Sequence, residues 1–203
     1  MGIDPGSKCT GCGVIEEINN ELKVVYWGSI KTKAHQPFPQ RLKFIYDELV
    51  SVIENFKPDE VAIEDMFFAT NVKSALKLGQ TRGVAVLSAV NKGKLVAEYS
   101  PLEVKQSVVG YGRAEKEQVR DMVTILLKLK EKPEPFDASD ALAVAICHMH
   151  ATAAKLKFKT EKKCSRTLKA NLPINLQSKL PLMLTVSGIR FLFRYQHFML
   201  CRN

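Results

Sequence analysis

The chain has 203 residues, 46% of them hydrophobic and 25% charged, which is the composition of a globular protein long enough to bury one full core. This balance excludes a chain that is disordered throughout, and the longest apolar stretch, LPLMLTVSGIRFLF, is too short and too charged to cross a bilayer. The formal net charge is +9, but residues 159–203 hold nine Lys and Arg against one Glu, so residues 1–158 carry only +1. The basic character therefore belongs to the C-terminal segment.

Apolar runs separated by turn residues predict the elements in chain order. Three strands come first and two more follow, and we expect the five at residues 1–5, 13–18, 22–29, 59–65 and 94–100. Helical spacing of apolar residues predicts helices at residues 40–56, 71–93, 101–109, 114–130 and 137–157. A run of strands followed by alternating helices and strands indicates an α/β fold, with a five-stranded mixed sheet flanked by helices.

Acidic residues stand at the ends of three separated apolar elements. Asp4 ends the first predicted strand, Glu64 ends the fourth, and Asp137 and Asp140 lie three residues apart on one face of the last helix. Taken one at a time, each acid has an ordinary explanation. Asp137 can cap its helix, Glu64 can be a solvated strand end, and Asp4 can stabilise the following turn.

Taken together, the acids require compensation, because two carboxylates at adjacent strand ends repel each other. A divalent metal ion supplies it, since Mg²⁺ and Mn²⁺ prefer oxygen ligands. Clustered carboxylates can hold two such ions about 3.5–4 Å apart for phosphodiester hydrolysis. The sequence thus predicts a two-ion site built from these four acids.

Four sequence blocks carry a resemblance to a known family: GIDPGSKCTGCGVI, AIEDMFFATNVKSALKLGQTRGVA, YSPLEVKQSVVGYGRAEKEQV and DASDALAVAICH. In order and spacing, over about residues 2–158, they resemble the RuvC family of bacterial Holliday junction resolvases. The resemblance implies a ribonuclease H-like fold and a homodimer that makes paired symmetric nicks in four-way DNA junctions, in DNA recombination and repair. It also implies two Mg²⁺ ions per active site, with Mn²⁺ as a substitute, no other cofactor, and the RuvA–RuvB branch-migration complex as a partner.

The resemblance also assigns roles to particular residues. The catalytic, metal-binding acids fall on Asp4, Glu64, Asp137 and Asp140. The aromatic residue near the junction centre falls on Phe67, whereas spacing alone would place both Phe67 and Phe68 in the core. The family's lysines near the active site fall on Lys105 and Lys116, and we expect Arg113 and Arg120 to join them against DNA phosphates. A solvated helix face is the alternative for these four cations.

The helix that starts near Asn71 is the expected dimer element. The residues that we place near one stripe of it are Ala75, Leu78, Gly79, Arg82 and Val86. Burial of this stripe against the chain's own sheet is the alternative.

The five cysteines form no disulfide framework, and with no signal peptide apparent they suggest a reduced, cytoplasmic setting. We expect Cys9 and Cys12 to lie in a turn without a metal or redox role, because a second pair of zinc ligands is missing. We expect Cys147, His148 and His150, on the last helix, to be core or surface residues.

The resemblance ends near residue 158. We therefore expect a nuclease domain at residues 1–158 and an atypical basic tail at residues 159–203, which is either disordered or foreign to the family. Three functions fit the sequence: a junction-resolving endonuclease, a ribonuclease H-like nuclease acting on structured RNA, and a phosphate-binding ATPase. The ATPase would need a second lobe for which the chain has no room, and a DNA-binding module without activity would not need four converging acids.

Overall fold

A computed structural model describes the backbone of residues 1–65 and 71–170 and the side chains of residues 1–65 and 71–155. The chain divides into two compact units, Met1–Lys155 and Leu156–Asn203. All of the predicted acids lie in the first unit. The helices of the described part of the chain are all too short or too polar to span a bilayer.

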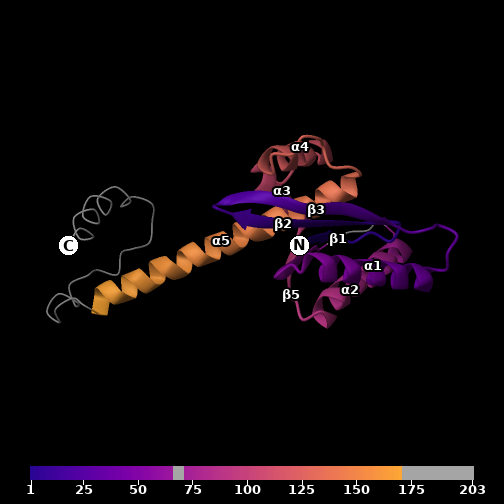
Figure 1. Ribbon diagram of the computed structural model, residues 1–203, viewed down its shortest axis with the longest axis horizontal. Helices are drawn as coiled ribbons and strands as arrows, with labels where there is room; N and C mark the ends of the chain where they lie inside the picture. Colours follow the sequence, from indigo (N-terminus) through magenta and orange to yellow (C-terminus); the bar gives the residue numbers. More distant parts are fainter. Residues whose placement is uncertain (66–70, 171–203) are drawn as a thin grey trace. The chain divides into compact units, whose positions relative to one another are not determined.

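In the described residues, ten elements follow one another in the order that the sequence predicts (Figure 1). The strands are β1 (Gly2–Asp4), β2 (Cys9–Ile18), β3 (Glu21–Lys31), β4 (Glu60–Glu64) and β5 (Leu95–Tyr99). The helices are α1 (Phe38–Phe56), α2 (Val72–Asn91), α3 (Pro101–Val109), α4 (Lys116–Leu126) and α5 (Phe136–Ala170).

The five strands form one mixed sheet in the order β3-β2-β1-β4-β5. Strand β1 is antiparallel to β2 but parallel to β4, and Ile3 of β1 pairs with Ile63 of β4. Parallel strands end at the same edge of a sheet, so this register places Asp4 and Glu64, the next residues along each strand, side by side. The sheet topology alone therefore brings two of the acids together.

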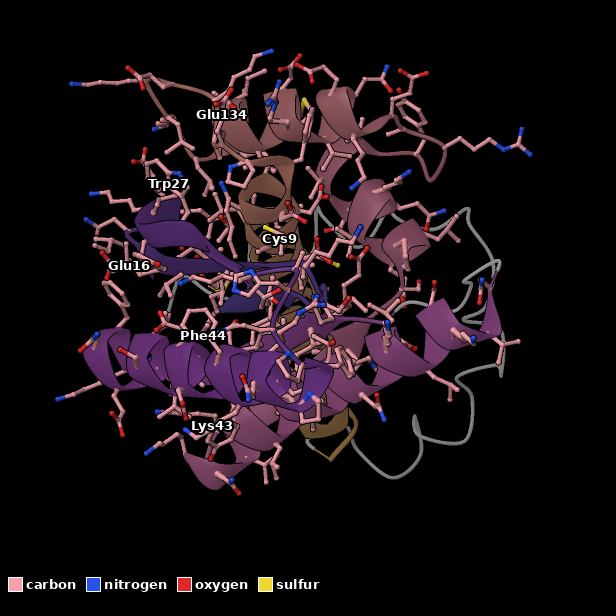
Figure 2. The ribbon with its side chains drawn as sticks, turned by 90° about the vertical axis from the view of Figure 1, so that its right-hand side faces the viewer. Cys9, Glu16, Trp27, Lys43, Phe44 and Glu134 are labelled. Atoms are coloured by element: carbon pink, nitrogen blue, oxygen red, sulfur yellow. The ribbon has the colours of Figure 1, made fainter. Side chains whose placement is uncertain are left out.

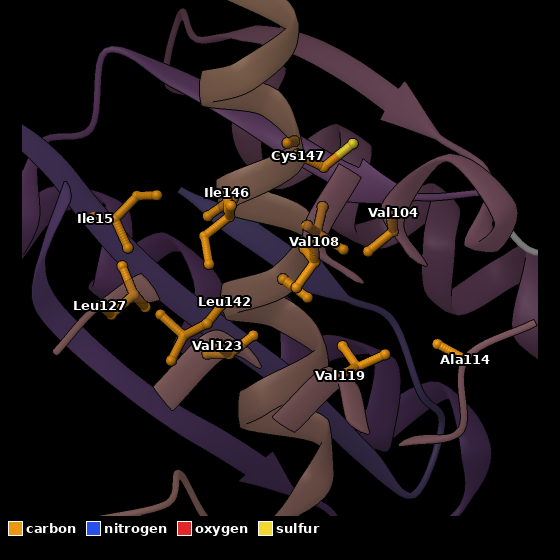
Figure 3. Close-up of a cluster of buried hydrophobic side chains, with 14 residues drawn as sticks. Ile15, Val104, Val108, Ala114, Val119, Val123, Leu127, Leu142, Ile146 and Cys147 are labelled. Atoms are coloured by element: carbon orange, nitrogen blue, oxygen red, sulfur yellow. The ribbon is translucent and has the colours of Figure 1, made fainter. Parts of the chain in front are cut away.

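Helices cover both faces of the sheet (Figure 1). On one face α1 and α2 bury a core that includes Ile45 and Leu49 of α1 together with Ile3 and Ile63 of the sheet. On the other face α3, α4 and α5 enclose a second core around Leu142 and its neighbours on α5 (Figure 3). The sheet is thus held between two apolar layers, which fixes the edge where β1 and β4 end.

Helix α5 packs unusually close to the sheet because glycines face it. A Cβ atom on Gly11 would lie 1.8 Å from the carbonyl oxygen of Asp137, and one on Gly2 would lie 2.1 Å from that of Ala141. Any side chain at these two positions would push the helix away. The glycines therefore allow the first turn of α5, which carries two of the acids, to approach the end of β1.

Several boundaries differ from the predicted ones, and two of the differences matter for the site and the domain. Strand β2 begins at Cys9, so the prediction that Cys9 and Cys12 lie in a turn was wrong. The segment CTGCG contains few strand-forming side chains, and its extended conformation comes from pairing with β3. Helix α5 continues to Ala170, so the last helix was predicted too short, and the expected domain boundary at residue 158 falls inside it. Residues 171–203 lie outside the described part of the chain.

Candidate active site

The four predicted acids line one cavity of about 390 Å³ at the edge of the sheet where β1 and β4 end. Its lining includes Asp4, Glu64, Asp137 and Asp140, together with Lys105 and Lys116. Three elements contribute the carboxylates: β1, β4 and the first turn of α5. The structure thus brings together all four acids that the sequence singled out.

Asp4 is the most strongly perturbed acid of the site. Burial, followed by the charges of Glu64 and Asp140, raises the pKa of Asp4 to about 8. Burial likewise raises the pKa of Glu64, with the charge of Asp140 adding to the effect. A carboxyl group in such surroundings holds a proton at neutral pH unless a cation replaces that proton.

Lys116 is the cation nearest to the acids. Its Nζ donates to Oδ2 of Asp140 at 2.9 Å, and this hydrogen bond is the main reason why the pKa of Lys116 is raised. The Asp140 side chain is 17% exposed while that of Lys116 is 68% exposed, so the ammonium reaches into the cavity from solvent. Lys105 comes from α3 and lines the same cavity, where its charge offsets a small part of the rise that burial causes in the pKa of Glu64.

The donor set fits hard divalent cations, because it consists of carboxylate oxygens whose mutual repulsion a cation would relieve. Within the described residues, no three Asp, Glu, His or Cys side chains converge tightly enough to form a complete metal centre. The acids instead stand around the cavity, and Lys116 takes one oxygen of Asp140. In this acidic site, a proton on Asp4 and the ammonium of Lys116 together neutralise part of the negative charge of the carboxylates.

The two predicted arginines have different surroundings. Arg113 is exposed in the turn between α3 and α4, where it is free to meet a phosphate. Arg120 instead pairs with Glu117 at 2.7 Å and stacks over the ring of Phe136, 4.1 Å from its centroid. Its guanidinium therefore fastens α4 to the residue that precedes Asp137. Phe67 and Phe68 lie outside the described residues, so the DNA role of Phe67 stays a prediction.

Cys9 lies beside one of the acids, although we predicted no function for it. Figure 2 shows Cys9 in the sheet layer, above α1. Its thiol is half-buried beside Asp137 and Ser29, and burial is the main reason why its pKa is raised. Cys12 is fully buried in the core on the α1 side. Neither thiol forms a disulfide within the described residues.

The outer face of α2 carries exposed apolar side chains, although not the stripe that we predicted. The exposed positions are Val72, Leu76, Leu87 and Val90. Between them lie Gly79 and Gly83, where an added Cβ would meet nothing within 4 Å. Of the predicted stripe, Val86 packs against the core, and Arg82 bonds to Asp65 at 3.1 Å and to Glu98 at 2.8 Å. Ala75 and Gly79 of the predicted stripe are also exposed, so the two stripes share Gly79, and the role of α2 in a dimer stays a prediction.

Reasoning from the sequence missed the residues that hold the turn after Asp4. The hydroxyl of Thr10 donates to the carbonyl oxygen of Gly6 at 2.8 Å, and Thr10 is fully buried. From the other side, Arg41 of α1 donates to the carbonyl oxygen of Ser7. A signal existed for Arg41, because it lies four residues before Ile45 on the apolar face of its helix, where a charge is unexpected.

A mixed sheet of five strands, with carboxylates from β1, β4 and the first turn of α5 around one cavity, defines a nuclease of the ribonuclease H-like fold. Within that class, the family model for crossover junction endodeoxyribonuclease RuvC matches residues 1–148. The chain belongs to this family.

Individual proteins show the same relationship. The crossover junction endodeoxyribonuclease RuvC of Alkaliphilus oremlandii is 55% identical over 150 residues, which are 74% of this chain and 92% of that protein. Among solved structures, Thermus thermophilus RuvC is 34% identical, with a TM-score of 0.70 over 76% of this chain and 95% of that one. RuvC of T. thermophilus in complex with a Holliday junction substrate is 36% identical, with a TM-score of 0.69 over 73% of this chain and 90% of that one.

Proposed function

We infer that this chain is a structure-specific endodeoxyribonuclease that resolves Holliday junctions in DNA recombination and repair. One observation carries the inference: in a chain of the RuvC family, four carboxylates from three segments line a single cavity. A nuclease that acts on structured RNA would use the same acids, so the substrate is what the first experiment must decide.

The family is one of metal-dependent nucleases, and we propose Mg²⁺ as the ion for this chain, with Mn²⁺ as a substitute. Asp4, Glu64, Asp137 and Asp140 would hold two ions, which when bound supply activation of water and stabilisation of the leaving 3′ oxygen. Because bound metal ions would activate water directly, the reaction would need no covalent enzyme intermediate. The expected products carry a 5′-phosphate and a 3′-hydroxyl, which a ligase can seal.

We assign Lys105 and Lys116 to the neutralisation of phosphates beside the cut. Both line the acidic cavity, and the exposed ammonium of Lys116 can exchange its bond to Asp140 for one to DNA. Arg113 is exposed in the turn that precedes α4 and can contact a phosphate further along the strand. Arg120 is engaged with Glu117 and Phe136, so we assign it to the support of α5 and not to DNA.

We propose further that the enzyme is a homodimer joined through the outer face of α2. Its exposed apolar residues and glycines follow one another at intervals of three or four, which is the spacing of a helix–helix seam. Gly79 and Gly83 would let two copies of the helix approach closely. A two-fold dimer would present two acidic cavities to a junction that itself has two-fold symmetry, which explains paired nicks.

A charge in the α2 seam tests the dimer. Leu76→Asp should change the mass in solution from twice 22.7 kDa toward that of a single chain. Leu95→Asp, an equally apolar and exposed position on β5, should leave the mass unchanged. A dimer in both variants would contradict the α2 interface. The RuvA–RuvB complex remains a predicted partner.

The substrate is tested with three labelled nucleic acids of similar size: a mobile four-way DNA junction, a linear DNA duplex and an RNA hairpin. In Mg²⁺ we expect nicking of the junction alone, with cuts in two strands of like polarity. Efficient cleavage of the RNA hairpin, with the junction intact, would favour the alternative nuclease.

A further inference from the structure

The turn that connects Asp4 to β2 is held in place by side chains from outside it: Thr10 of β2 binds Gly6, and Arg41 and Thr32 bind the residues that follow. We propose that Arg41 of α1, together with Thr32, is a positioning device for the Asp4 carboxylate; we call these two residues the turn clamp. The inference rests on the proposed function, since it concerns how Asp4 is presented to the metal ions.

The turn clamp binds the backbone of Ser7 and Lys8. Arg41 donates through Nη2 to the carbonyl oxygen of Ser7 and through Nε to the hydroxyl of Thr32 at 3.0 Å. The Thr32 hydroxyl in turn donates to the same Ser7 carbonyl at 2.9 Å, and the Thr32 amide donates to the Lys8 carbonyl at 3.0 Å. Two neighbouring carbonyls of the turn are therefore bound by groups from α1 and from the residue after β3.

The clamped segment is the part of the connection that the sheet does not fix. Strand β1 ends at Asp4 and β2 begins at Cys9, so only the intervening residues can shift. Pro5 and Gly6, which join Asp4 to the clamped turn, themselves line the acidic cavity. Movement of Ser7 would therefore be transmitted through two residues to the carboxylate that most needs exact placement.

Stability alone does not explain the choice of arginine. Arg41 is only 9% exposed, and no described Asp or Glu forms an ion pair with it. Burying a guanidinium without a carboxylate partner is costly, and hydrogen bonds to a carbonyl and a hydroxyl, together with the ring of Phe38 at 5.7 Å, offset that cost only in part. The planar fork, however, can donate to two acceptors at a fixed spacing, which a lysine cannot do. This geometric property suits positioning.

The test compares four chains: wild type, Arg41→Met, Arg41→Lys and Thr32→Val. Lys43→Met is the matched control, because Lys43 lies on the same helix (Figure 2) and its side chain is 76% exposed. Three quantities are measured: Mn²⁺ affinity by electron paramagnetic resonance, the Mg²⁺ concentration for half-maximal junction nicking, and amide hydrogen exchange in residues 6–8. Thermal unfolding without metal checks that each chain is folded.

Removing a group that orients a metal ligand typically weakens metal affinity 10–100-fold. We expect Arg41→Met to weaken Mn²⁺ binding about tenfold and to raise the half-maximal Mg²⁺ concentration by the same factor. Exchange in residues 6–8 should become faster, while junction affinity in Ca²⁺ stays as in wild type. Arg41→Lys should recover part of the metal affinity, because a lysine restores one of the two donors. Lys43→Met should match wild type throughout.

A folded Arg41→Met chain with wild-type Mn²⁺ affinity would overturn the positioning role, whatever its stability. If Arg41→Met fails to fold, Thr32→Val decides the question, since it removes one donor to Ser7 and the acceptor of Arg41 without changing side-chain volume. A wild-type chain that neither binds Mn²⁺ nor nicks a junction would overturn the proposed function. Unchanged exchange in residues 6–8 of Arg41→Met would overturn the clamp by itself.

Discussion

Replacing Asp4 by Asn should make the metal-free protein more stable at alkaline pH. The folded protein raises the pKa of Asp4 from 3.8 to about 8, chiefly by burial, so the folded chain keeps a proton that the unfolded chain has released. The stabilisation from that proton is complete below about pH 4 and is lost as the pH rises toward 8. The loss corresponds to at most about 5 kcal/mol. The Asn side chain does not ionise, so the Asp4→Asn variant does not undergo this loss of stability.

The assay is thermal unfolding in a chelator, from pH 4 to pH 8.5, for wild type, Asp4→Asn and the control Asp59→Asn, whose side chain lies outside the site and is exposed. For a chain of this size, one kcal/mol shifts the melting temperature by about 2–4 °C. Wild type should fall below Asp4→Asn by about 10 °C at pH 8, with the two curves meeting near pH 4. Parallel curves across the whole pH range would refute the assignment of Asp4 as the buried, proton-holding acid.

Three further changes have defined outcomes. Lys116→Met should slow junction nicking at least tenfold and lower the slope of log affinity against log salt by about one, as measured by fluorescence binding at several salt concentrations. Junction nicking at the wild-type rate by this variant would contradict the role assigned to Lys116 in the site. Gly11→Ala should cost about 1–3 kcal/mol in urea unfolding, because its methyl group would meet the carbonyl of Asp137 at 1.8 Å; an unchanged midpoint would contradict the close approach of α5. Deleting residues 171–203 should leave the melting temperature and junction nicking unchanged in moderate salt and weaken only low-salt binding to linear duplex, whereas unfolding would make that segment part of the domain.

The acids could be predicted from the sequence because each stands at one end of an apolar element: Asp4 and Glu64 end strands, and Asp137 and Asp140 begin the last helix. Ile3 and Ile63 are both fully buried and pair across β1 and β4, so the residues that follow them had to emerge together. Asp137 and Asp140 lie within one turn of α5, as their spacing of three residues predicts. These features follow from local sequence patterns and from the order of the strands along the chain, both of which can be read from the sequence.

The partners of the arginine side chains depend on which helix surfaces pack against each other, and the sequence alone does not determine that packing. The partners of Arg120 lie within the chain, and its surface location could not be told from a DNA-facing one. Arg82 lay on the expected dimer stripe, yet it bonds to Asp65 and Glu98. Side-chain partners of long cations are set by tertiary packing, and periodicity determines a helix face only to within a neighbouring stripe.

The most direct measurement is strand-resolved nicking of a mobile four-way junction by wild type and Asp4→Asn, with Mg²⁺ or Ca²⁺ as the only divalent ion. Wild type should cut two strands of like polarity symmetrically in Mg²⁺, leaving 5′-phosphates, and should bind the junction without cutting it in Ca²⁺. Asp4→Asn should bind the junction at least as tightly as wild type and cut it in neither ion, because it lacks one carboxylate of the site. Full cleavage by Asp4→Asn in Mg²⁺, or wild-type cleavage without any divalent ion, would contradict a metal-dependent nuclease built on these four acids.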